Sequence, residues 1–93
     1  MTERELTKLV LKCLGALKTS KDLDLRITST SYDEGSVSDD KKIVYHIIYY
    51  NGRRSKNIDL DFYLNTLDNI NTPEEQIALG RNIIARIYVQ AKA

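Results

Sequence analysis

Residues 42–60 read KIVYHIIYYNGRRSKNIDL and predict the β-hairpin that decides the fold. β-branched and aromatic residues fill its first half, as is typical of strands. The Asn51-Gly52 pair is the strongest short-range hairpin signal, because a type I′ turn needs positive φ at both central positions. A two-residue turn also fixes the register. Tyr50 is therefore expected to face Arg53, and His46 to face Asn57.

This register sorts the hairpin into two faces. The predicted core face carries apolar side chains, namely Ile43, Tyr45, Ile47, Ile58 and Leu60. The other face is mixed, with Val44, His46, Ile48 and Tyr50 beside Arg53, Ser55, Asn57 and Asp59. Such a pattern predicts helices on one side of the sheet, with the mixed side left open.

The rest of the chain supplies one more strand and two helices. Residues 22–32 (DLDLRITSTSY) alternate between apolar and polar side chains and predict a half-buried strand. Residues 2–18 carry apolar side chains at helical spacing behind a capping box of Thr2 and Glu5, and Thr19-Ser20 is expected to end this helix.

A second helix is expected from Thr72 onward, because an N-cap threonine precedes Pro73 at the first helical position and Glu75 at the third. Its predicted buried stripe consists of Ile77, Gly80, Ile84, Ile87, Tyr88 and Ala91. Gly80 is interpreted either as a point of close approach to the sheet, which is favoured, or as a tolerated weak spot in the helix.

The element order α-β-β-β-α predicts an α+β fold: a three-stranded antiparallel meander with two helices packed on one face. Ninety-three residues are expected to form a single globular domain over 1–93, with no room for a second core. A net charge of +1, spread evenly, argues against a bulk polyanion binder, which needs a concentrated basic face.

The single cysteine, Cys13, excludes an internal disulfide and a cysteine-cluster zinc site, and it is expected to be a buried, inert thiol. No run of residues has the length and apolarity of a signal-peptide core or a membrane span. Cytoplasmic localisation is therefore expected.

No catalytic residue, cofactor or metal site is expected. His46 has no nucleophile partner by spacing, and an enzyme would need it within hydrogen-bond range of a carboxylate such as Asp59. Asp59 and Asp61 are interpreted as the solvated side of the third strand. The acidic stretch 33–40 lacks the ligand spacing of an EF-hand loop and is interpreted as a solvated hairpin loop.

The order α-β-β-β-α resembles that of the double-stranded-RNA-binding domain, in element order alone and over most of the chain. That resemblance implies contacts from the first helix, from the loop between the first two strands and from a basic start of the second helix. The first helix does offer Arg4, Lys8 and Lys12, but the loop is acidic and the second helix begins with Glu74-Glu75. Because two of the three regions have the wrong sign, a double-stranded-RNA role is not expected.

The expected function is a non-enzymatic protein-binding module, such as a small adaptor, inhibitor or accessory subunit similar in size to the compact accessory proteins of phages and other mobile elements. Its surface is the mixed sheet face with the hairpin, namely Val44, His46, Ile48, Tyr50, Arg53, Arg54 and Lys56. The expected partner is another protein or a second copy in a homodimer. The alternative is weak nucleic-acid binding through the basic hairpin and the helical stripe of Arg4, Lys8 and Lys12.

Overall fold

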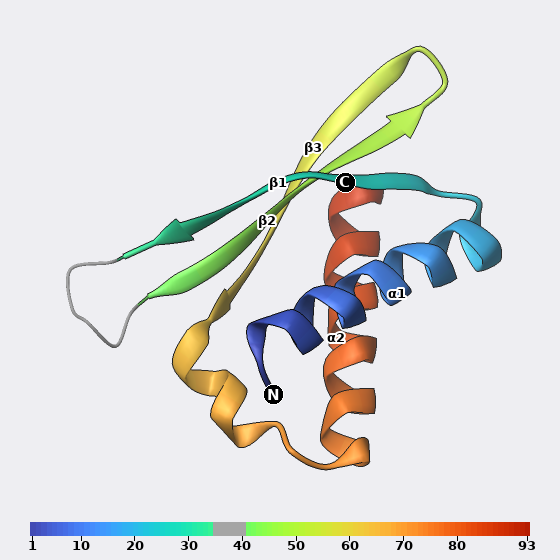
Figure 1. Cartoon of the computed structure of the whole chain (residues 1–93). Coiled ribbons are helices and arrows are strands. Elements are labelled where there is room, and N and C mark those ends of the chain that lie inside the picture. Colours follow the sequence, from blue (N-terminus) through green and yellow to red (C-terminus); the bar gives the residue numbers. More distant parts are fainter. Residues whose placement is uncertain (35–40) are drawn as a thin grey trace.

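The computed structural model describes residues 1–34 and 41–93. Its elements are α1 (Glu3–Lys21), β1 (Asp24–Asp33), β2 (Lys42–Asn51), β3 (Arg54–Tyr63), the 3₁₀ helix η2 (Leu64–Asn69) and α2 (Pro73–Lys92). The strands form one antiparallel sheet in the order β1-β2-β3, and Figure 1 shows α1 and α2 on the same side of this twisted sheet. The predicted α+β meander is confirmed. Most of the acidic stretch 33–40 lies outside the described residues.

Both helices begin as the sequence predicts. The Thr2 hydroxyl accepts a hydrogen bond from the Glu5 amide and the Glu5 carboxylate accepts one from the Thr2 amide, and Thr72 and Glu75 form the same reciprocal box. α1 continues to Lys21 instead of ending at Thr19-Ser20, and it stops where Asp22 adopts the left-handed conformation. No helix in the described ranges is long and apolar enough to cross a membrane.

The β2–β3 turn lies one residue further along the chain than expected. Asn51 pairs with Arg54, so Gly52 and Arg53 are the central residues. Gly52 has a φ of 64°, and Arg53 is not among the residues with positive φ. Positive φ at the first central position alone is the pattern of a type II′ turn, with the glycine where that turn requires it. The type I′ prediction is therefore wrong.

The displaced turn moves every β3 partner by two residues. His46 faces Asp59 rather than Asn57, and Asn57 instead faces Ile48. A shift of two leaves each side chain on its predicted face, because side chains alternate with a period of two. The core face is thus confirmed: Ile43, Tyr45, Ile47, Ile58 and Leu60 are each no more than 2% exposed.

β1 changes its alternation at Thr28, where a β-bulge interrupts the pairing with β2 between Ile27 and Ser29. The bulged Thr28 hydroxyl donates a hydrogen bond to the His46 carbonyl. Beyond the bulge, Tyr32 turns to the helix side, where its hydroxyl donates to a Glu3 carboxylate oxygen 3.2 Å away. The strict alternation expected over residues 22–32 therefore holds only for the first half of the strand.

The buried stripe of α2 differs from the predicted one. Gly80, Ile83, Ile87 and Ala91 are buried, whereas Ile77 is 56% exposed. Relative to the predicted orientation, α2 is rotated about its own axis, because it packs on α1 as well as on the sheet. Gly80 marks the contact with α1, since its carbonyl lies 3.6 Å from the Cys13 sulfur. The close approach is thus to a helix, and the prediction that Gly80 meets the sheet is wrong.

Gly80→Ala is expected to stabilise the protein by about 0.5–1 kcal/mol, the usual gain for alanine over glycine inside a helix. A β-carbon at position 80 would lie 3.6 Å from Leu9 Cδ1 and 3.9 Å from the Cys13 sulfur, which is ordinary van der Waals contact. Urea denaturation measures the change. Gly52→Ala is the matched control and should destabilise by about 1–2 kcal/mol, because alanine is strained at positive φ. A destabilising Gly80→Ala would show that the helices cannot accept this methyl group.

Candidate interaction surface: the open sheet face

The side of the sheet turned away from α1 and α2 is called the open face. Within the described ranges, the strand pairing assigns it Asp24, Arg26, Ser29, Ser31 and Asp33 of β1; Lys42, Val44, His46, Ile48 and Tyr50 of β2; and Ser55, Asn57, Asp59, Asp61 and Tyr63 of β3.

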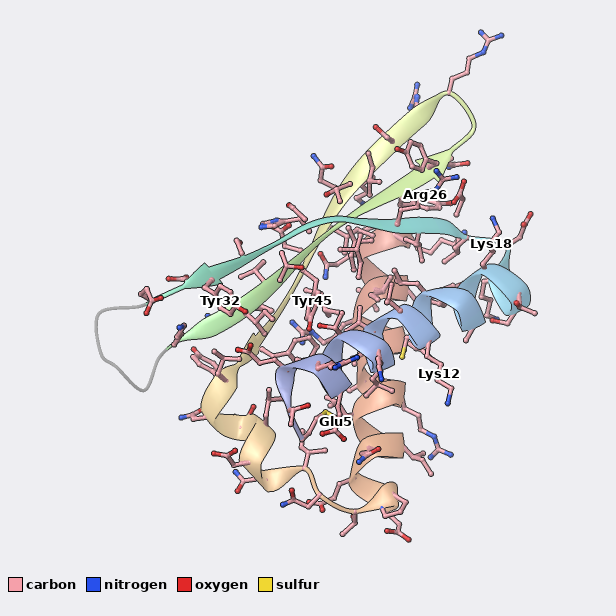
Figure 2. The ribbon with its side chains drawn as sticks, in the orientation of Figure 1. Glu5, Lys12, Lys18, Arg26, Tyr32 and Tyr45 are labelled. Atoms are coloured by element: carbon pink, nitrogen blue, oxygen red, sulfur yellow. The ribbon has the colours of Figure 1, made fainter. Side chains whose placement is uncertain are left out.

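An apolar row follows β2 along the middle of the open face. Val44 and Ile48 are partly exposed and Tyr50 is 42% exposed. The Arg26 guanidinium lies 5.5 Å from the Tyr50 ring centroid, within cation–π range. Figure 2 labels Arg26 on β1. It also shows Tyr45, the residue that follows Val44, on the other side of the sheet and pointing toward α1. One side of the sheet is thus covered by the helices, and the other side is accessible.

A hydrogen-bonded chain crosses all three strands in the middle of this face. The Ser31 hydroxyl lies 2.7 Å from His46 Nε2, and His46 Nδ1 lies 3.0 Å from Asp59 Oδ1. The bulge in β1 brings Ser31 to this side, and the displaced hairpin register brings Asp59 opposite the histidine. Both ring nitrogens of His46 are therefore engaged within the protein.

This chain has the connectivity of a serine-hydrolase triad, in which histidine Nε2 meets the serine and Nδ1 the aspartate. The Asp59 side chain is 68% exposed, so water screens its interaction with the imidazole. Two hollows among the described residues, of about 400 Å³ and 230 Å³, include none of the three residues. We therefore interpret the chain as a link that fixes the three strands relative to one another.

Asp61 joins the sheet to α2 at the β3 edge. Its carboxylate lies 2.7 Å from Arg86 Nη2 and 3.4 Å from Lys42 Nζ, while Arg86 Nη1 donates to the Asp61 carbonyl at 3.0 Å. Burial alone would raise the pKa of Asp61, but hydrogen bonds from Lys42 and Arg86 outweigh it and hold that pKa below its usual value. Asp61 is thus a structural residue rather than merely part of the solvated side of β3.

The predicted surface residues divide between the two sides of the sheet. Val44, His46, Ile48 and Tyr50 lie on the open face, with Arg53 in the adjoining turn. Arg54 and Lys56 lie on the helix side, where they line the 400 Å³ hollow with Ala91 and Ala93. Lys56 donates a 2.7 Å hydrogen bond to the Ala93 carbonyl at the end of α2, where a cation is favoured by the helix dipole.

Arg4, Lys8 and Lys12 are exposed on α1, on the helix side of the molecule. Lys8 and Lys12 line the 230 Å³ hollow together with Leu9 and Gln76. The sheet separates this stripe from the open face, so the structure does not bring the two predicted sets of binding residues together. Cys13 is buried as predicted, and burial raises the pKa of its thiol.

Sequence reasoning missed two residues of the open face that interact there, Arg26 and Ser31. It named Asp59 as a carboxylate that could reach His46, but the statement that His46 has no nucleophile partner is wrong, because the Ser31 hydroxyl lies 2.7 Å from its Nε2. The alternation of apolar and polar residues in its strand places Arg26 on the side opposite the core, so this pattern was sufficient to predict Arg26 as an open-face residue. Across the part of the chain that the structure describes, no group of three or more histidine, cysteine, aspartate or glutamate side chains could hold a metal ion. No protein-family model, curated protein or solved structure matches this chain.

Proposed function

We propose that this protein is a non-enzymatic, cytoplasmic protein-binding module, such as an adaptor, inhibitor or accessory subunit, and that its partner docks on the open face. The observation that carries the proposal is the apolar row of Val44, Ile48 and Tyr50 on a side of the sheet without a covering helix in the described ranges. Tyrosine and arginine are enriched in protein interfaces, and here they are paired as Tyr50 and Arg26.

The charges of the open face favour a protein over a nucleic acid. Four of its members are aspartates and two are cations, Arg26 and Lys42. A phosphate backbone would be repelled by this excess of carboxylates. The ring of Tyr63 is also occupied, since Lys42 Nζ lies 4.6 Å from its centroid, which leaves it less suited to stack on a base.

The test is capture of partners from the native host with the purified protein as bait. Ile48→Asp places an unpaired carboxylate in the middle of the apolar row and should abolish capture, while Tyr50→Ala should weaken it. Val89→Asp is the matched control, because Val89 is an apolar residue 66% exposed on α2. If both open-face variants stay folded, as judged by circular dichroism, and retain every partner and any self-association, the open face is not the docking surface.

Ser31 is expected to be unreactive toward a fluorophosphonate, a reagent that labels serine hydrolases at the activated hydroxyl. The solvent-exposed Asp59 gives the imidazole little electrostatic support, and neither described hollow would hold the reagent beside Ser31. Mass spectrometry of the treated protein measures the label. Labelling that disappears in both Ser31→Ala and His46→Gln would contradict the non-enzymatic assignment.

A further inference from the structure

We infer that the occupant of the open face is a second copy of this chain, stacked face to face in a two-fold dimer whose axis runs parallel to β2. The inference rests on the proposed function, since it names the partner of the same surface. The observations behind it are the position of the apolar row on the central strand and the unequal character of the two edge strands.

The position of the row allows it to pack on itself. A two-fold axis above β2 brings the β2 strands of the two copies together, so that each Ile48 lies close to its counterpart and each Tyr50 near the other Tyr50. Facing sheets in proteins stack about 10 Å apart with their strands within roughly 30° of each other, a geometry that side chains of this size can fill. The apolar row is thereby removed from water on both copies.

The edge strands determine the orientation of the second copy. On the open face, the middle of β1 offers donors, the Arg26 guanidinium and the hydroxyl of Ser29, whereas the Ser31 hydroxyl is engaged with His46. The middle of β3 offers the carboxylate of Asp59, whereas the Asp61 carboxylate is paired with Arg86 and Lys42. An axis parallel to β2 places β1 of each copy over β3 of the other, so donors meet carboxylates. An in-plane axis perpendicular to the strands would place β3 over β3 and oppose the aspartates, which is unfavourable.

Arg26 and Asp59 are the opposite charges that would make this contact, and Arg26 would exchange its 3.5 Å ion pair with Asp24 for one with Asp59 of the other copy. The Arg26 side chain and the Asp59 side chain are each 68% exposed. Arg26 of β1 and Asn57 of β3 both pair with Ile48 of β2. Asp59 is the next residue after Asn57 on the open face of β3, so it is offset from Arg26 by two residues along the strands. An arginine side chain spans such an offset, so each dimer would contain two equivalent Arg26–Asp59 contacts related by the axis.

The size of the face predicts a weak dimer. Three strands about 4.8 Å apart and ten residues long, at about 3.3 Å per residue, cover about 470 Å² on each copy. The two copies together bury close to the roughly 1,000 Å² that marks the lower end of biological interfaces. We therefore expect a dissociation constant in the micromolar range or above, with a mixture of monomer and dimer in solution.

Sedimentation equilibrium over a range of concentrations tests the inference with the intact chain. Wild-type protein should approach twice its 10.7 kDa mass as concentration rises. Arg26→Glu alone should oppose two carboxylates at both contacts, and Asp59→Lys alone should oppose two cations at both contacts. Each single variant is expected to weaken association by about tenfold or more. An equimolar mixture of the two variants should dimerise again, because both contacts then join opposite charges.

Recovery on mixing is a result that loss of folding cannot mimic. Arg81→Glu, a charge reversal at an exposed position on α2, is the matched control and should leave association unchanged. A wild-type chain that stays monomeric at every concentration overturns the inference, and so does a dimer that neither reversal weakens. Neither result decides the proposed function, because capture of a different protein that depends on Ile48 would still establish the open face as a docking surface.

Discussion

Tyr45→Ala is expected to lower the free energy of unfolding by about 3–5 kcal/mol, the usual cost of removing a large aromatic side chain from a core. Tyr45 is fully buried, its ring meets Phe62 edge to face at 6.2 Å, and its hydroxyl lies 2.8 Å from the Thr7 hydroxyl on α1. A domain of this length has a total stability of about 5–14 kcal/mol, so the substitution removes a large share of it.

Tyr45→Phe separates the two contributions of this residue. It keeps the ring contact and removes the hydrogen bond to Thr7, and we expect a loss of about 1 kcal/mol. Urea denaturation followed by circular dichroism measures both variants. A loss below about 1 kcal/mol for Tyr45→Ala would contradict the placement of this ring at the centre of the core.

Arg86→Ala is expected to cost about 2 kcal/mol, because it removes two hydrogen bonds to Asp61, one of them between charged groups. It also removes the cation that lies 5.2 Å from the Phe62 ring centroid. Arg81→Ala is the control, since Arg81 is exposed on the same helix and should change stability by less than about 0.5 kcal/mol. Equal effects of the two substitutions would show that the contact between α2 and β3 contributes little.

The same contact predicts a pH dependence. The pKa of Asp61 is held below its ordinary value in the folded protein, so its contribution to stability is present above the unfolded value of about 3.9 and is lost as pH falls through the folded pKa. Wild type should therefore exceed Asp61→Asn in stability near neutral pH, and the difference should shrink below about pH 4. A difference that stays constant down to about pH 2 would contradict this assignment.

The hairpin shows why the faces of the sheet could be predicted when its register could not. Asn51-Gly52 is a strong turn signal, but Gly52 alone satisfies a type II′ turn when it occupies the first central position. The turn therefore moves by one residue and the partners by two. Because the alternation has a period of two, burial of Tyr45 and exposure of Tyr50 are the same in either register.

The interactions of the candidate surface depend on features that a residue pattern does not contain. Ser31 reaches His46 because a bulge at Thr28 reverses the alternation of β1, and no glycine or proline marks that bulge. Asp59 lies directly opposite His46 only in the displaced register. The residues of the apolar row could be predicted from the sequence, whereas their polar neighbours required the strand pairing.

The helix side shows a similar division. Capping boxes are local, so Thr2 and Thr72 mark the helix starts reliably. The face that a helix buries depends on every element packed against it. Ile77 and Ile83 both fit an amphipathic pattern, but the contact of Gly80 with α1 turns Ile83 inward and leaves Ile77 exposed.

The central claim is that a second copy docks on the open face, and dilution followed by NMR tests it most directly. Amide spectra of isotope-labelled protein would be compared between high and low concentration, since a weak dimer dissociates on dilution. We predict concentration-dependent shifts at Arg26, Ile48, Tyr50 and Asp59, with unchanged signals along the outer surface of α2. Spectra that do not change with concentration, or shifts confined to α1 and α2, would contradict the account.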